Sequence, residues 1–493
     1  MDPQLTLSRH DKPDAEPLGS LLKPDRLSAW AWTLGYTALL STLSVLRYNL
    51  WIAEGDDLGL FRQGLWLIAH RGLLAPSTYT GHPILADAAS YILVLLAPLY
   101  QVGGVGFLLV LQAFAFGLGY LFIRRIAEQL GVDQRWAHVV GVVYLLYPTV
   151  LGANLFDFHP DAFGIPILLA LIWAAVAENW LAYGILLVVS LLVKDTVPIL
   201  LLGTGAALLL QRRPAWGVVT LAVGALGFAL DALWLIPNLT HGPMVLWGAY
   251  YGQFGATPQT GIADILTHPQ LLLTWVRSSH NWEYLVWILG PVGVFVLIVG
   301  KKALNPWWIP VLLFLETNLL SSTPVVTSPF NELSVLVLPF LFGATLVGLQ
   351  GSSKPGRRQT AIAAAIAVAF LVVFAWHDYH VYWTYRPPNT AQLAEMAQII
   401  PKDAPVVAPN FIAAHFADRS KEWLPAVTIG QQIPRGTYVI LDSAVTTGLT
   451  SPSVYAAYDR LLGTKGTAVV VFSQTQVTVY RLLRPITPTL TQP

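Results

Sequence analysis

Long apolar runs separated by short polar segments fill the chain between residues 27 and 377. Residues 360–375, TAIAAAIAVAFLVVFA, carry no charge and approach the roughly 20 residues that a helix needs to cross a bilayer. The pattern predicts eleven transmembrane helices and hence a polytopic all-α membrane protein. The predicted spans are about 27–46, 105–123, 137–156, 160–177, 180–193, 196–210, 216–236, 284–300, 306–320, 331–349 and 360–377.

Two segments between the first two runs have a different pattern. Residues 53–72, AEGDDLGLFRQGLWLIAHRG, carry apolar side chains at helical spacing, which predicts an amphipathic helix lying on the membrane. Asp56 or Asp57 would be the N-cap of this helix. Residues 91–101, YILVLLAPLYQ, are few for a crossing, so they are either a twelfth span or a segment half-buried on one side, and the distribution of basic residues favours the second.

After about residue 380 the apolar runs become short. The segments DAPVVAPNF, TYVILDSA and GTAVVVFSQTQVTVYRLL are typical of short strands, and NTAQLAEMAQII and SPSVYAAYDRLLG are typical of amphipathic helices. We therefore predict three parts: an N-terminal tail over 1–26, a transmembrane domain over 27–380 and a small α/β domain over 381–493.

Composition agrees with a membrane protein and narrows the chemistry. Of the 493 residues, 55% are hydrophobic and 11% charged, against about 25% charged in a typical soluble domain. The absence of cysteine excludes disulfides and thiol catalysis. A net charge of +1 offers no basic surface for a nucleic acid, so the expected partners are membrane lipids and small substrates.

The basic residues predict the orientation in the membrane. With eleven crossings, four short loops on one side hold ten basic residues, and the longer loops on the other side hold five. The basic side faces the cytoplasm, so we expect a multi-pass protein of the plasma (inner) membrane. Its N-terminal tail would be cytoplasmic and its α/β domain extracytoplasmic.

Ionisable residues gather at the predicted outer face, although they are far apart in the sequence. Charged groups at membrane depth usually face a cavity or a partner and indicate function. The residues are Asp56 and Asp57 after the first span, Asp87, then Asp157, His159 and Asp161 in one turn, Lys194 and Asp195 in the next, and Glu332.

The turn NLFDFHPDAFGIP, residues 154–166, combines acids and an imidazole with a helix start. Pro160 suits the first position of a helix, and Asp161 falls in its first turn, where the helix dipole favours an acid. A capping role explains Asp161 alone. Asp157 and His159 are not needed to start the helix, so we interpret them as a functional pair.

Two assignments stay open at this point. Lys194 and Asp195 are either a surface pair or a substrate site in which the lysine binds a phosphate. No metal-binding motif is present, and no cofactor is expected with certainty. A divalent cation held by Asp57, Asp157 and His159 remains an alternative.

Several segments resemble the DUF2079 family of bacterial and archaeal membrane proteins. They are DLGLFRQGLWLIAHRG, LADAASYILVLLAPLY, LLYPTVLGANLFDFHPDAFGIPILLA, LLVKDT and the C-terminal IPKDAPVVAPNFIAAHFADR. The chain departs from the family pattern at Ala88, where a histidine is usual, and at Tyr91, where a proline is usual. Arg62 replaces a common acid, and Asn331 and Glu332 replace a frequent His-Tyr pair.

The arrangement is in turn similar to the GT-C superfamily of glycosyltransferases. That resemblance implies an inverting sugar transfer from a polyprenyl-phosphate donor to a lipid or glycan acceptor at the extracytoplasmic face. It implies Asp57 as the general base, with Asp157 second and His159 beside it. Asp56, Asp87, Asp161, Lys194, Asp195 and Glu332 would bind substrate.

Two other functions stay open. A transporter or flippase would move a lipid-linked or small polar substrate, although no internal repeat is visible. A non-catalytic membrane scaffold would use the C-terminal domain as its binding module.

Overall fold

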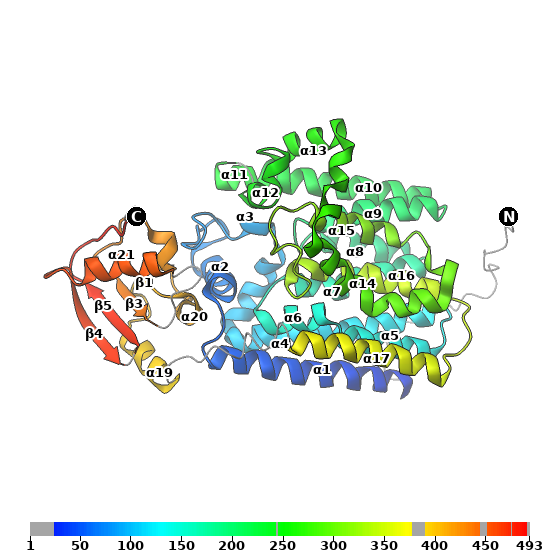
Figure 1. Ribbon diagram of the computed structural model, residues 1–493, viewed down its shortest axis with the longest axis horizontal. Helices are drawn as coiled ribbons and strands as arrows, with labels where there is room; N and C mark the ends of the chain where they lie inside the picture. The colour runs from blue at the N-terminus through cyan, green and yellow to red at the C-terminus, as the bar shows by residue number, and fades with distance from the viewer. Residues whose placement is uncertain (1–23, 243–244, 377–389, 444–450, 475, 491–493) are drawn as a thin grey trace.

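A computed structural model of the chain describes residues 24–242, 245–376, 390–443, 451–474 and 476–490. The predicted tail over 1–26 lies almost entirely outside these residues, and the first described helix begins at Pro24. The molecule is elongated, with a body of helices and a sheet at the end that holds the C-terminus (Figure 1).

The helical body contains most of the described chain. Its helices are α1 (Pro24–Asn49), α2 (Leu60–Arg71), α3 (Leu85–Ala88), α4 (Ile92–Gln129), α5 (Gln134–Leu145), α6 (Pro148–Phe156), α7 (Asp161–Val176), α8 (Trp180–Ser190), α9 (Val197–Leu210), α10 (Pro214–Phe228), α11 (Ile236–Thr240), α12 (Val245–Tyr251), α13 (Pro258–Thr267), α14 (Ser279–Val299), α15 (Trp308–Leu319), α16 (Leu338–Leu349) and α17 (Arg357–Phe374). A π-helical turn, Gly55–Gly59, precedes α2, and a 3₁₀ turn, Glu332–Val337, precedes α16.

Every predicted span coincides with a helix, but the helices differ in length. Among the described residues, five helical stretches are long and apolar enough to cross a membrane. They are Ile92–Gln129, Pro214–Thr240, Ser279–Ala303, Glu332–Leu349 and Arg357–Phe374. The pair α5 and α6, bent by 42°, would make a sixth as one broken span, and α7, α8, α9 and α15 are shorter. The protein is thus a multi-pass membrane protein, whereas the number of eleven spans remains a prediction.

The segment 91–101 forms the first part of α4, which continues from it into the next predicted span. Gly104, at φ 66°, breaks the helical backbone between the two halves, a conformation that glycine adopts at little cost. Ile92, Leu93 and Leu96, before the break, pack against the segment that contains α2.

The predicted amphipathic helix is found as α2, and its position on the membrane surface remains a prediction. Most of its residues are buried, including Arg62 and Gln63. The N-cap residues are Gly59 for α2 and Glu54 for the π-helical turn, and neither makes a side-chain capping bond, so Asp56 and Asp57 are not caps. The helix is covered by the C-terminal part of the chain, since Arg62 pairs with Asp418 at 2.7 Å.

The C-terminal part forms a five-stranded sheet in the order β2-β1-β3-β5-β4. Its strands are β1 (Val406–Val407), β2 (Glu422–Trp423), β3 (Tyr438–Asp442), β4 (Ala468–Gln474) and β5 (Val477–Leu482). The strand β1 is parallel to β2 and β3, whereas β5 is antiparallel to β3 and β4. Helices α19 (Thr390–Ile399), α20 (Asn410–Ala413) and α21 (Pro452–Leu462) accompany it. The predicted strands and both predicted helices are therefore found, and β2 was missed.

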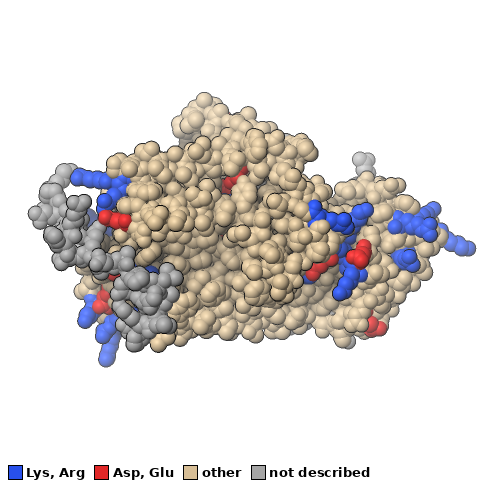
Figure 2. Space-filling view, turned by 180° about the vertical axis from the view of Figure 1, so that it is seen from behind, with Lys and Arg blue, Asp and Glu red and all other residues tan. Residues whose placement is uncertain are grey.

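Charge is distributed unevenly over the surface. In Figure 2, Lys and Arg gather toward the two ends of the long axis, and a broad belt between them has almost no charged side chain. Such a belt is what a bilayer requires of a membrane protein, because a charge at its centre is costly. The sheet extends from one end of this belt, next to the helix ends that carry the predicted site (Figure 1).

Candidate active site

A cavity of about 250 Å³ opens among the helix ends next to the sheet. Eight of the nine predicted site residues line it, and Asp157 does not. The eight are Asp56, Asp57, Asp87, His159, Asp161, Lys194, Asp195 and Glu332. Sites for drug-sized ligands usually measure about 300–1,000 Å³, so this cavity fits one small polar group rather than a long chain.

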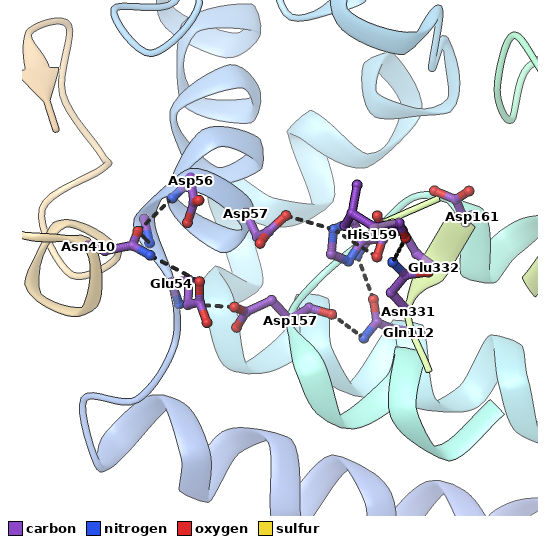
Figure 3. A network of polar contacts seen from close by, with 12 residues as sticks. Glu54, Asp56, Asp57, Gln112, Asp157, His159, Asp161, Asn331, Glu332 and Asn410 are labelled. Carbon is purple, nitrogen blue, oxygen red and sulfur yellow. Dashed lines mark hydrogen bonds and ion pairs between the residues drawn. The ribbon is translucent and has the colours of Figure 1, made fainter. Parts of the chain in front are cut away.

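The centre of the cavity is His159, which lies between two carboxylates. Its Nε2 is 3.1 Å from Asp57 Oδ1 and 3.7 Å from Glu332 Oε2 (Figure 3). The backbone N–H of His159 donates to Gln112 Oε1 at 2.8 Å, which fixes the residue. Burial alone would lower the pKa of His159, but Glu332 and Asp57 outweigh it and raise that pKa to about 9. The imidazole is therefore cationic at neutral pH.

Asp161 and Lys194 form a second, buried ion pair. Lys194 Nζ donates to Asp161 Oδ1 at 2.9 Å, and the two side chains are 11% and 3% exposed. Asp161 begins α7, as predicted, but no side chain caps this helix. The capping interpretation of Asp161 and the surface-pair interpretation of Lys194 with Asp195 are both wrong, because the chain folds these turns together at the cavity.

Asp87 and Asp195 lie on another wall of the cavity. The backbone N–H of Asp195 donates to the Ala88 carbonyl at 3.1 Å, which joins the turn before α9 to α3. Burial raises the pKa of Asp195 to about 7 despite Lys194, and burial also raises the pKa of Asp87. Asp195 can therefore exchange a proton near neutral pH, and both carboxyl groups can bind a polar group in the cavity.

Asp157 lies behind the cavity and not in it. Its Oδ1 is 2.7 Å from Arg47 Nη1, its Oδ2 accepts from the Glu54 backbone N–H at 2.9 Å, and its side chain is only 2% exposed. The expected pairing of Asp157 with His159 is not among the described contacts, in which His159 bonds to Asp57 instead (Figure 3). Burial raises the pKa of Asp157 to about 7, although Arg47 opposes this effect.

Three carboxylates in the described part of the chain are close enough to share a metal ion. Glu54, Asp56 and Asp57 each offer an oxygen, and these atoms lie within 4.8 Å of one another. Asp56 Oδ1 is buried without a hydrogen-bond partner, so the set has a free ligand atom. This set replaces the predicted combination of Asp57 with Asp157 and His159. Burial and the neighbouring acids raise the pKa of Glu54 to about 8.

Comparison with known proteins decides the family. A family model described as "Predicted membrane protein (DUF2079)" matches residues 48–457. The chain belongs to the DUF2079 family. No curated protein matches it.

The fold of this DUF2079 protein is similar to that of ArnT from Cupriavidus metallidurans bound to undecaprenyl phosphate. The match has a TM-score of 0.50 and 14% identity, and it covers 94% of this chain and 99% of ArnT. Apo ArnT from the same organism matches with a TM-score of 0.38 and 13% identity over 91% of this chain and 98% of that one. The first match confirms the resemblance to GT-C glycosyltransferases at the level of the fold.

Several site residues of the DUF2079 protein were missed in the sequence. Trp247, Tyr250 and Tyr251 of α12 line the cavity, as does Asn318 of α15. The aromatic run LWGAYYGQF in the long segment 237–283 could have indicated them, because a polar loop does not need four aromatic rings. Arg47 and Asn410 carried no local signal, because their partners are remote in sequence.

Three polar residues of the C-terminal part, His415, Asp418 and Arg419, lie outside the cavity and do not pair with one another among the described contacts. His415 is stacked between Tyr48 and Trp51, with centroids 4.2 and 3.7 Å away. Arg419 is buried, and its Nη1 donates to the Ala404 carbonyl at 2.7 Å, while Asp418 bonds to Arg62. These side chains hold the domain together and attach it to α2.

Proposed function

We propose that this protein is a GT-C-type membrane glycosyltransferase. It would transfer a sugar from a polyprenyl-phosphate donor to a lipid or glycan acceptor at the extracytoplasmic face. The observation that carries the proposal is the contact of Asp57 with His159 in a cavity lined by eight acidic and basic side chains at the helix ends of a DUF2079 protein. The similar fold of ArnT, solved with undecaprenyl phosphate, supports a lipid phosphate as the donor.

In the proposed reaction Asp57 is the general base. It accepts the proton of the acceptor hydroxyl as that oxygen bonds to the anomeric carbon and the bond from this carbon to the phosphate oxygen breaks. A positioned carboxylate typically contributes a factor of about 10²–10⁴ to such a step. His159 donates a hydrogen bond to Asp57, which orients the carboxylate toward the cavity. A single displacement of this kind inverts the anomeric centre, as the GT-C resemblance implies.

The leaving phosphate needs positive charge, which the cavity offers at two places. Lys194 and His159 are the charged donors on its wall, and the N-terminus of α7 begins beside them at Asp161. Backbone N–H groups at a helix start favour anions. The prenyl chain does not fit the cavity and would lie along the apolar belt of the helices.

A divalent cation is a further candidate component. Glu54, Asp56 and Asp57 would hold it, because their oxygens lie close together and one of them has no other partner. When bound, such an ion would stabilise the charge that develops on the leaving phosphate.

The test uses purified protein in nanodiscs with radiolabelled polyprenyl-phosphate sugars and lipid or glycan acceptors. Asp57→Asn should lower transfer per folded molecule by at least about 100-fold, with the folded fraction measured by thermal unfolding. The matched control is Asp264→Asn, since Asp264 forms an exposed pair with His268 on α13 and should leave transfer unchanged.

Two results would reject the proposed glycosyltransferase activity. One is the absence of transfer from every donor tested, and the other is full activity of the Asp57→Asn variant. Movement of a lipid-linked substrate across liposome membranes without transfer would instead support a transporter.

A further inference from the structure

The turn that carries Asp56 and Asp57 does not cap itself. It is a π-helical turn, Gly55–Gly59, and its N-cap residue Glu54 makes no side-chain capping bond. The first N–H groups of a helical turn have no partner within the turn, so something else must accept from them. Because Asp57 is the proposed base, the acceptor of these N–H groups decides where the base points.

The partner comes from the C-terminal domain, more than 350 residues along the chain. Asn410 Oδ1 accepts from the backbone N–H of Gly55 at 2.8 Å and of Asp56 at 3.1 Å. Asn410 Nδ2 donates to Glu54 Oε2 at 3.0 Å (Figure 3). One neutral amide thus caps the turn and also binds the carboxylate at its start, where three acids repel one another.

The backbone of the turn is built for this close approach. A Cβ atom at Gly55 would lie 2.6 Å from Ala413 Cβ and 2.9 Å from the Asn410 carbonyl oxygen. Any larger residue would push α20 away and lengthen the bonds of Asn410. The next turns of α2 are attached to the same domain through Arg62 and Asp418.

We propose that Asn410 is a positioning residue of the active site. By capping the turn from outside, it holds Asp57 against His159. The C-terminal domain therefore completes the catalytic site of the helical body and is not a separate acceptor-binding module. This inference rests on the proposed glycosyl transfer, in which Asp57 is the base.

The kinetic test compares four variants of the full-length protein in nanodiscs. Asn410→Ala should lower kcat by about 10- to 100-fold, with the KM values for donor and acceptor changed less than about threefold. Asn410→Asp keeps the acceptor atom but sets a carboxylate against Glu54, so it should also be impaired. Combining it with Glu54→Gln restores a donor in the reverse direction and should restore the contact of Asp57 with His159, a structural readout that is chosen because Glu54 is itself a candidate cation ligand.

Gln431→Ala is the matched control. Gln431 is an exposed residue of the same domain, and its side-chain amide donates to the Val427 carbonyl. This bond does not involve the turn of Asp57, so the loss of the amide should leave kcat unchanged. A purely structural role for Asn410 would lower the amount of folded protein and not kcat. Unfolding temperatures of all variants make this distinction.

A structure of the Asn410→Ala variant by electron cryo-microscopy is the readout that does not depend on activity. Asp57 should move away from His159, and an unchanged 3.1 Å contact would overturn the proposal even if the protein transfers sugar. Unchanged kcat in Asn410→Ala, or a rise in acceptor KM alone, would also overturn it. If the wild type shows no transfer while Asp57 does move, the proposed function fails and the positioning role of Asn410 stands.

Discussion

At the scale of single residues, the site is a set of carboxylates with few cations. His159 and Lys194 are the basic side chains on the cavity wall, and each is already within 3.1 Å of an acid. Burying ions without partners is costly, so every additional carboxylate must bind a ligand, take up a proton or reach solvent. The protonation state of the cavity residues is therefore testable at His159.

The stability of the protein should depend on pH through His159. Its pKa in the folded state, about 9, is above the ordinary value of 6.5, so the folded state holds the proton more tightly. The stabilisation is complete below pH 6.5 and is lost as the pH rises through about 9. Its contribution to the free energy of unfolding is at most on the order of 3 kcal/mol. The unfolding temperature of the wild type should fall as the pH rises through this window, and the unfolding temperature of His159→Gln should change less. His268→Gln, at an exposed histidine, should behave like the wild type.

Asp157 should show the opposite mutational signature to Asp57. Asp157→Asn removes the carboxylate that faces Arg47 in a buried pair, and breaking such a pair costs about 3–5 kcal/mol. Because Asp157 does not line the cavity, kcat of the folded fraction should change less than about threefold. Unfolding curves and active-fraction kinetics check this, and a large loss of kcat at unchanged stability would instead make Asp157 catalytic.

At the scale of elements, small residues let the helices approach closely. A Cβ atom at Gly203 of α9 would lie 2.4 Å from the Cα atom of Pro310 in α15, a backbone atom that cannot rotate away. Such close backbone contacts are typical of helix pairs in membranes, where packing replaces the hydrophobic effect. The short helices α9 and α15 thereby hold the turn of Lys194 and the cavity residue Asn318 near each other.

Gly203→Ala should therefore destabilise the helical body. We expect a loss of about 1–3 kcal/mol, the usual cost of overpacking, because the two helices must separate. Gly293→Ala in α14 is the control, since no atom lies within 4 Å of the added Cβ. Unfolding in detergent measures both, and equal stability of the two variants would contradict the packing argument.

At the scale of the whole molecule, the charged ends and the uncharged belt define how the protein sits in a bilayer. The helices α2 and α3, which contribute residues to the cavity, lie at the end of the helical body that adjoins the C-terminal sheet (Figure 1). The sequence assigns that end to the outside, because the short basic loops belong to the other face. A lipid-linked donor could then approach the cavity from the outer leaflet.

The orientation is testable because the chain has no cysteine, so each introduced one is unique. Lys402 in the C-terminal domain and Lys354 in a basic loop are both exposed. A membrane-impermeant maleimide should label Lys402→Cys in intact cells and should label Lys354→Cys only after permeabilisation. The reverse pattern would place the domain in the cytoplasm and exclude an extracytoplasmic site.

The sequence by itself determined the helices, four of the five strands of the C-terminal part and the eight acidic and basic residues that line the cavity. Apolar runs must become helices in a bilayer, since each backbone group needs a partner within its own segment. Charged residues at helix ends, from Asp57 to Glu332, could be chosen as site residues because burying a charge at membrane depth is costly and usually indicates function. These features depend on a residue and its near neighbours.

Only the tertiary structure decided the partners. It separated Asp157 from His159, paired Lys194 with Asp161, buried α2 under the C-terminal domain and brought Asn410 to the turn of Asp57. A hydrogen bond or ion pair between residues that are far apart in the sequence depends on how the helices pack. No local sequence pattern indicates such a contact. The residues of the site could therefore be chosen from the sequence, whereas the hydrogen bonds and ion pairs between them could not.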